Sequence, residues 1–186
     1  ICQALKFLPI NSVEIFWDDR NTSRVPSNIP WSITPFSAVV DTNGVTGYIA
    51  QEFLKLSLHR VLNDDKWIVM DADVLLRQPW QFEENVWYYD PDESGQNYWF
   101  FLKYALDIDP QLERWMTPIW LCERKILQAI DSELHLRHRA SIEKIYKRSG
   151  AQTFSEVELY AYYSVHFLNR RYQRRPHGLA MTPYFE

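Results

Sequence analysis

The segment FLKLSLHRVLNDDKWIVMDADVLLRQPW, residues 53–80, decides the fold of this 186-residue chain. Apolar residues recur at close to helical spacing over 49–62 with polar residues between them, which predicts an amphipathic helix. After a polar turn, the apolar run WIVM at 67–70 is typical of a strand buried on both faces of a parallel sheet. An earlier apolar run, SVEIFW at 12–17, predicts a strand that ends in a polar turn. Strand, helix and strand in this order predict an α/β fold with a mixed, mostly parallel sheet flanked by helices.

The rest of the chain carries less specific patterns. Prolines and small polar residues over 21–35 predict a long surface loop. Dense Leu, Ile, Glu, Lys and Arg residues favour helix over 118–146, and 155–168 predicts a further helix capped by Ser155. No repeat or linker divides the sequence, so we expect residues 1–186 to form a single domain. Three further expectations are a strand at 86–89, either helix or strand at 98–106, and a loop from residue 169 onward.

Charge and composition restrict the partners. The net charge of −4 and the pI near 5.8 argue against nucleic acid, whose binding relies on clustered basic residues. The arginines at 170–175 are more typical of a solvated face, although they could meet a diphosphate or an acidic membrane surface. Cys2 and Cys122 lack metal-ligand spacing, and a reducing, cytoplasmic location fits them. No apolar run approaches the roughly 20 residues of a transmembrane segment, and no signal peptide pattern opens the sequence.

Asp71 and Asp73 carry the most informative chemistry. They follow directly on the apolar run 67–70, and ligands of α/β sheets gather at the carboxyl ends of strands. Two carboxylates one residue apart can reach a single hard cation, which can bridge the oxygens of a diphosphate. Such a pair is also frequent in polar turns, where both aspartates are merely solvated. The strand that precedes the pair is what favours a functional interpretation.

With these features in place, the segment 53–80 resembles the helix, strand and D-x-D motif of GT-A glycosyltransferases. A second segment, TFSEVELYAYY at 153–163, is similar to a Ser-Glu helix start found downstream in a group of these enzymes. The resemblance is to glycosyltransferases that build bacterial and viral surface glycans, and the compact size is similar to domains encoded by large algal viruses. It implies a GT-A, Rossmann-like fold, a nucleotide-sugar donor that is usually a UDP-sugar, and a hydroxyl acceptor such as a glycan.

The resemblance also implies roles for particular residues. Mn²⁺ or Mg²⁺ would be held by Asp71 and Asp73, with Asp73 the stronger ligand, and His177 would complete the metal shell. Glu156, just inside the predicted helix start, would be the catalytic base of an inverting enzyme, although a role in helix-end electrostatics explains it equally well. Ser155 and Glu158 have the spacing of a capping box, which leaves Glu156 without a structural explanation.

The donor would also meet residues outside the D-x-D motif. Asp18 follows the strand at 12–17, in the manner of an aspartate that accepts a hydrogen bond from the nucleotide base in related enzymes. Gln51 and Lys55 lie one turn apart on the predicted helix and could reach the donor phosphates, although solvation of that helix face is the more ordinary role.

One departure from the family concerns the start of the sequence. GT-A domains open with a strand and a loop that hold the nucleotide, whereas this sequence begins with what resembles the following helix, ICQALKFL. Either that unit is lost or it lies outside the sequence.

The predicted function is metal-dependent transfer of a hexose from a nucleoside diphosphate sugar to a hydroxyl, with inversion if Glu156 is the base. A retaining mechanism stays open. The aromatic content of 16% supports a rival function, a noncatalytic carbohydrate-binding module, although a heavily aromatic core explains it too. A metal-dependent phosphohydrolase that uses the same aspartates is a weaker alternative.

Overall fold

The computed structural model describes residues 12–20, 30–71, 74, 80–90, 98–110, 113 and 115–176. Two of the predicted metal ligands, Asp73 and His177, lie outside these residues. The elements are, in chain order, β1 (Glu14–Trp17), β2 (Ser32–Pro35), η2 (Phe36–Ala38), α1 (Gly47–Ser57), η3 (Leu58–Arg60), β3 (Lys66–Met70), β4 (Val86–Tyr89), α2 (Trp99–Leu106), β5 (Ile119–Glu123), α3 (Arg124–His138), α4 (Ile142–Ser149), α5 (Glu156–His166) and β6 (Gln173–Pro176).

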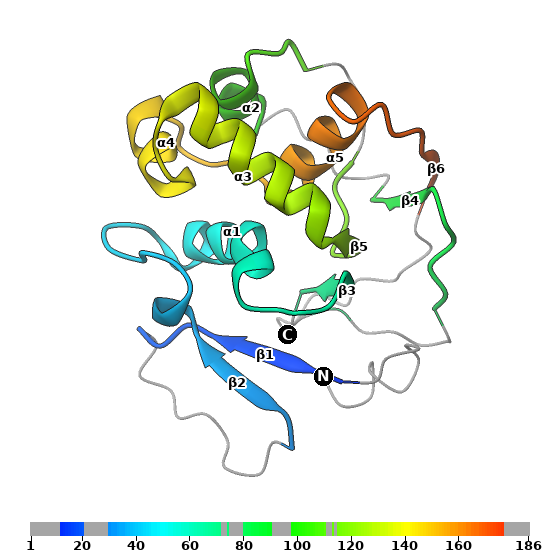
Figure 1. Ribbon diagram of the computed structural model, residues 1–186, viewed down its shortest axis with the longest axis horizontal. Coiled ribbons are helices and arrows are strands. Elements are labelled where there is room, and N and C mark those ends of the chain that lie inside the picture. Colours follow the sequence, from blue (N-terminus) through cyan, green and yellow to red (C-terminus); the bar gives the residue numbers. More distant parts are fainter. Residues whose placement is uncertain are drawn as a thin grey trace, which may run out of the picture.

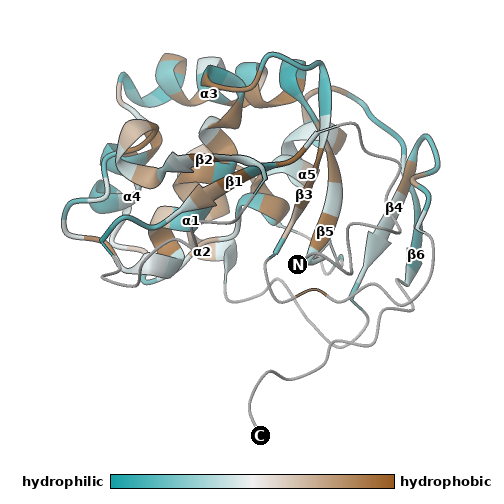
Figure 2. Ribbon diagram, turned by 90° about the horizontal axis from the view of Figure 1, so that it is seen from below, coloured by the Kyte–Doolittle hydropathy of each residue, from teal (hydrophilic) through white to brown (hydrophobic). Residues whose placement is uncertain are grey.

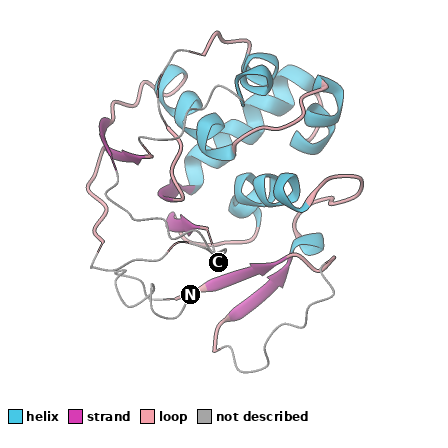
Figure 3. Cartoon of the chain, turned by 180° about the vertical axis from the view of Figure 1, so that it is seen from behind, coloured by secondary structure: helices cyan, strands magenta, loops and turns pink. Residues whose placement is uncertain are grey.

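The described strands form two-stranded pairs of both senses. β1 runs parallel to β2, β4 runs parallel to β6, and β3 runs antiparallel to β5 (Figures 1 and 3). The chain is therefore mixed α/β, as predicted, but its described strands make separate short pairs instead of one mostly parallel sheet. The antiparallel β3–β5 pair is the one that positions the candidate site.

The helix α1 forms where its sequence predicts it, although it begins two residues earlier and ends in the 3₁₀ turn η3. The hydroxyl of Thr46 caps it by accepting a hydrogen bond from the backbone N–H of Ile49 at 3.3 Å. Its buried face includes Ile49, Phe53 and Leu56, which pack toward α3 and α5. Helix α3 is amphipathic in the same way, and Figure 2 shows hydrophobic and hydrophilic residues alternating along it.

The two faces of β3 meet different surroundings because side chains alternate along a strand. Trp67 and Val69 pack into the main core beneath the helices, whereas Ile68 and Met70 pack into a smaller cluster with Ile119. Because side chains alternate, Asp71, two residues after Val69, lies on the same side of the strand pair as Val69. The strand therefore directs that residue toward α1 and α5.

Three segments have a different secondary structure from the one predicted, and a fourth, left undecided by the sequence, is now assigned. Residues 119–123 are the strand β5 and not helix, because pairing with β3 outweighs the helical composition of the segment around them. Residues 32–35 form β2 beside β1, and 173–176 form β6 beside β4, where loops were expected. The ambiguous segment 98–106 forms the helix α2. Each of these strands depends on a partner far along the chain.

Aromatic side chains fill much of the core. Trp87 stands edge-on to Trp115, with ring centroids 5.7 Å apart, and Trp120 lies against Tyr160 at 4.6 Å. All four rings are buried. Helix α5 is buried on nearly every side from Glu156 to Ser164. Core packing of this kind accounts for part of the high aromatic content without sugar-stacking walls.

Within the described residues, the helices are too short or too polar to cross a lipid bilayer.

Candidate functional site

Asp71 stands immediately after β3, at the carboxyl end of the strand. Its backbone N–H donates to the carbonyl of Pro118 at 2.9 Å, which extends the β3–β5 hydrogen bonding by one residue. This bond fixes the backbone from which the carboxylate projects. The side chain is 31% exposed, so a ligand in solvent can reach it.

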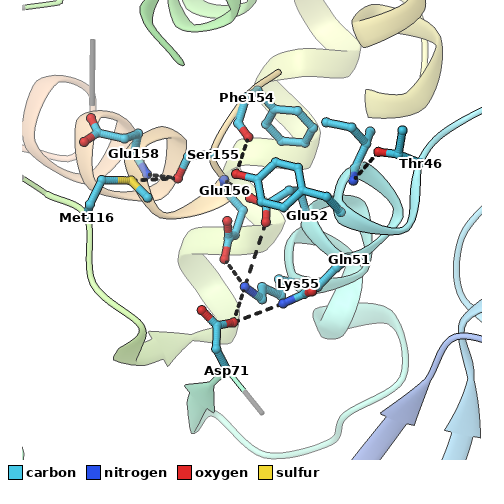
Figure 4. A network of polar contacts seen from close by, with 12 residues as sticks. Thr46, Gln51, Glu52, Lys55, Asp71, Met116, Phe154, Ser155, Glu156 and Glu158 are labelled. Carbon is cyan, nitrogen blue, oxygen red and sulfur yellow. Dashed lines mark hydrogen bonds and ion pairs between the residues drawn. The ribbon is translucent and has the colours of Figure 1, made fainter. Parts of the chain in front are cut away.

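Lys55 brings its ammonium group to Asp71 from the third turn of α1. Its Nζ lies 2.7 Å from Asp71 Oδ1 and 2.8 Å from Glu156 Oε1, and only 11% of the lysine side chain is exposed. Gln51, one turn earlier on the same helix face, donates from Nε2 to Asp71 Oδ1 at 3.0 Å. Figure 4 shows these side chains converging from α1, α5 and the end of β3.

The amino-terminal end of α5 supplies the other half of the network. Ser155 is the N-cap, and its hydroxyl accepts a hydrogen bond from the backbone N–H of Glu158 at 3.3 Å, as the sequence predicts. The backbone N–H of Glu156 donates to Glu52 Oε2 at 2.9 Å. A carboxyl group of α1 thus satisfies one of the N–H groups that the start of α5 leaves without an intrahelical acceptor. We call Glu52, Lys55, Asp71 and Glu156 the lysine network.

Burial and charge oppose each other within this network. Burial by itself raises the pKa of Glu156, but attraction to Lys55 and hydrogen bonds from Glu52 and Lys55 hold its pKa below the usual range. Burial lowers the pKa of Lys55, yet the nearby carboxylates of Glu156 and Asp71 raise it above the usual range. Lys55 is therefore a fixed positive charge at any physiological pH.

Four residues predicted separately from the sequence thus meet at the end of β3: Gln51, Lys55, Asp71 and Glu156. Glu52 was not predicted. It stands at an apolar-face position of α1, between Ile49 and Leu56, and an acidic residue at such a position is the signal that could have identified it.

The predicted base, Glu156, is enclosed in this arrangement. Only 3% of its side chain is exposed, and Lys55 occupies its Oε1. A general base must come within hydrogen-bond distance of the acceptor hydroxyl, and no such approach is open in this conformation. The base role stays a prediction that requires the network to open.

Asp18 belongs to a different part of the molecule. It follows β1 and forms an ion pair with Arg20 at 2.8 Å, and a hydrogen bond from Arg20 lowers the pKa of its carboxyl group. Arg20 also donates to the carbonyl of Val45, and Asp18 Oδ2 would lie 3.3 Å from a Cβ at Gly47. Asp18 therefore lies beside the start of α1, whereas Gln51 and Lys55 act from its later turns.

The donor chemistry of Asp71 fits a hard cation. Among the described residues no group of three or more His, Cys, Asp or Glu side chains is arranged to hold a metal. An ion carried by a diphosphate needs only one or two protein carboxylates, since phosphate oxygens and water supply its other ligands. Asp71 meets that requirement, because its carboxylate stands at a strand end, is partly exposed, and is oriented by hydrogen bonds from Lys55 and Gln51 to Oδ1.

A cavity of about 230 Å³ lies elsewhere, between β5 and β4. Its walls include Phe82, Ile119 and Leu121. Phe82 and Ile119 belong to the smaller cluster on the face of β3 opposite to Asp71. The cavity is thus separate from the lysine network.

A family model covers residues 10–177, which include all the candidate residues discussed above. The chain belongs to this family, described as a family of unknown function (DUF6492). No curated protein and no solved structure matches the chain.

Proposed function

We propose that this chain is a metal-dependent glycosyltransferase of the GT-A type. The observation that carries the proposal is the convergence of Lys55 and Gln51 on Asp71 Oδ1 at the carboxyl end of β3. The sequence motif supplies the carboxylate, and α1 supplies two donors that orient it. The partial exposure of this carboxylate at the strand end supports a donor site there.

The reaction needs positive charge where the leaving nucleoside diphosphate develops negative charge. Lys55, whose ammonium lies 2.7 Å from Asp71, would orient that carboxylate toward the metal ion that supplies this charge. Gln51 donates a second hydrogen bond to the same carboxylate oxygen and so limits its rotation. Bound Mn²⁺ or Mg²⁺ would supply Lewis-acid stabilisation of the diphosphate, held by Asp71 and Asp73 and completed by His177.

The donor and acceptor follow from the resemblance to GT-A enzymes. A UDP-sugar that carries a hexose is the proposed donor, Asp18 is a candidate for the nucleotide base, and a glycan hydroxyl is the proposed acceptor. Inversion with Glu156 as base requires Lys55 to release that carboxylate, because proton transfer needs direct contact with the hydroxyl. A cytoplasmic location also stays a prediction.

Calorimetry with UDP tests the donor site. We expect UDP to bind with Mn²⁺ and to bind at least tenfold more weakly without it. Asp71→Asn, which keeps the shape and removes a charged ligand, should abolish most of the Mn²⁺ dependence. The matched control is Asp109→Asn, because this carboxylate is 80% exposed and pairs with Lys103 on α2.

Two outcomes would count against the proposal. UDP affinity that is unaffected by Mn²⁺ in the wild-type protein would favour a module that binds sugars without a nucleotide site. Hydrolysis of phosphate esters in the presence of Mn²⁺, without transfer or release of sugar from any nucleotide sugar in a panel, would favour the phosphohydrolase.

A further inference from the structure

One ammonium group faces three carboxyl groups in the lysine network. Lys55 Nζ lies 2.7 Å from Asp71, 2.8 Å from Glu156 and 3.9 Å from Glu52. Asp71 is partly exposed, but Glu52 and Glu156 each expose only 3% of their side chains. Two buried carboxylates that share one site repel each other strongly, and a single lysine cannot neutralise all three acids.

The distances to Lys55 differ among the three acids and favour Glu52 as the one that carries a proton. Lys55 makes close ion pairs with Glu156 and Asp71, which favours the ionised form of both. Glu52 stands more than 1 Å farther from the ammonium, and it accepts a hydrogen bond from the backbone N–H of Glu156 at 2.9 Å. A protonated Glu52 can donate to Glu156 while its other oxygen accepts the backbone N–H of Glu156.

We propose that Glu52 is a positioning residue that acts as a neutral carboxylic acid, tying the first turn of α5 to α1 so that Glu156 holds Lys55 against Asp71. The positioning role of Glu52 rests on the proposed function, whereas its neutral charge state does not. Glu52 itself touches neither a donor nor a metal.

The electrostatic surroundings agree with this charge state. Burial raises the pKa of Glu52 most, repulsion from Glu156 and the carboxyl hydrogen bond raise it further, and Lys55 and the backbone N–H of Glu156 only partly offset this. The described titratable groups that face Glu52 are Tyr48 and Lys55 from α1 and Glu156 from α5. Burial raises the pKa of Tyr48, so Tyr48 stays neutral.

The pH dependence of unfolding tests the charge state on the free protein with Glu52→Gln. Glutamine keeps both hydrogen bonds and cannot ionise. An acid whose folded pKa is raised loses stability as pH rises from its unfolded pKa, about 4.3, toward the folded value. Relative to E52Q, the wild-type unfolding constant should therefore rise up to tenfold per pH unit above about pH 4.3. The proposal would be overturned if E52Q were less stable than wild type at pH 7 and this difference in unfolding free energy disappeared in acid.

UDP affinity in the presence of Mn²⁺ tests the positioning role. E52Q should bind UDP within about twofold of wild type, whereas Glu52→Leu, which has no acceptor for the Glu156 N–H, should bind at least tenfold more weakly. The matched control is Glu143→Leu, because Glu143 is also a buried helical acid and lies in α4, away from the lysine network. Equal loss of affinity in both leucine variants would reduce Glu52 to a structural residue and overturn its positioning role. If the wild-type protein does not bind UDP with Mn²⁺, the proposed function fails, and the pH experiment still decides the charge state.

Discussion

Removal of the Lys55 ammonium is the most direct perturbation of the lysine network. Lys55→Met keeps most of the apolar stem and deletes two close ion pairs, to Asp71 and to Glu156. Deletion of one partner of a buried pair costs about 3–5 kcal/mol, because the remaining charge is left without compensation. Water can reach Asp71, whose side chain is 31% exposed, so we expect the lower end of this range, about 3 kcal/mol.

Urea unfolding at pH 7 measures this loss, and thermal melting should show a decrease of about 6–12 °C for a chain of this length. The control is Lys125→Met, which removes an ion pair to Glu123 at 3.0 Å from a lysine that is 69% exposed. Surface pairs of this kind contribute about 0–1 kcal/mol. The structure therefore predicts that K55M loses about 2 kcal/mol or more of unfolding free energy beyond the loss in K125M.

Acidification provides a second test of the same variant. Because Lys55 holds the folded pKa of Glu156 below its usual range, this stabilisation is present above about pH 4.3 and is lost as pH falls through the folded pKa. The destabilisation of K55M should accordingly shrink in acid. Our reasoning would be refuted by a loss at pH 7 no larger than that of K125M, or by a loss that stays constant down to pH 3.

Two further variants test the start of α5. Glu156→Gln removes one charged partner of Lys55 and should lower the free energy of unfolding by about 1–3 kcal/mol, measured in urea. It should also weaken UDP binding in the presence of Mn²⁺, measured by calorimetry. If UDP affinity persists while sugar transfer falls about 10²-fold or more, Glu156 is instead the base. Ser155→Ala removes the N-cap of α5 and should cost about 1 kcal/mol in urea unfolding with sugar transfer retained, and an unchanged midpoint would show that the cap contributes nothing.

Local patterns predicted the elements whose signals lie within a few residues. The helix at 49–62, the strand at 67–70 and the capped helix from Ser155 have their own periodicity or cap, and all three form with small shifts at their ends. The strand, however, pairs antiparallel with β5 and buries only Val69, so the expected burial on both faces of a parallel sheet is wrong. The strand β5 was missed because its five residues are embedded in a helical composition, and only pairing with β3 makes them extended. Strand pairing is non-local, so composition in one window carries little information about it.

The residues of the candidate site likewise fall into those that local sequence predicts and those that only the tertiary structure identifies. Asp71, Lys55, Gln51 and Glu156 could be selected from motif, position and residue type, because each stands at a strand end, on a helix face or at a helix start. Glu52 could not be assigned a role, since its acidity has meaning only beside Glu156, which is 104 residues away.

The sequence by itself determined the α/β class, the carboxylate at the end of β3 and the helix that precedes it, because these depend on periodicity and residue chemistry over short windows. Only the tertiary structure decided that Lys55 is buried between Asp71 and Glu156, and that Glu156 is enclosed where solvent does not reach it. The physical reason is that charge state and access depend on burial and on neighbours from other elements. Packing of α1 against α5 sets both, and it is a property of the whole fold.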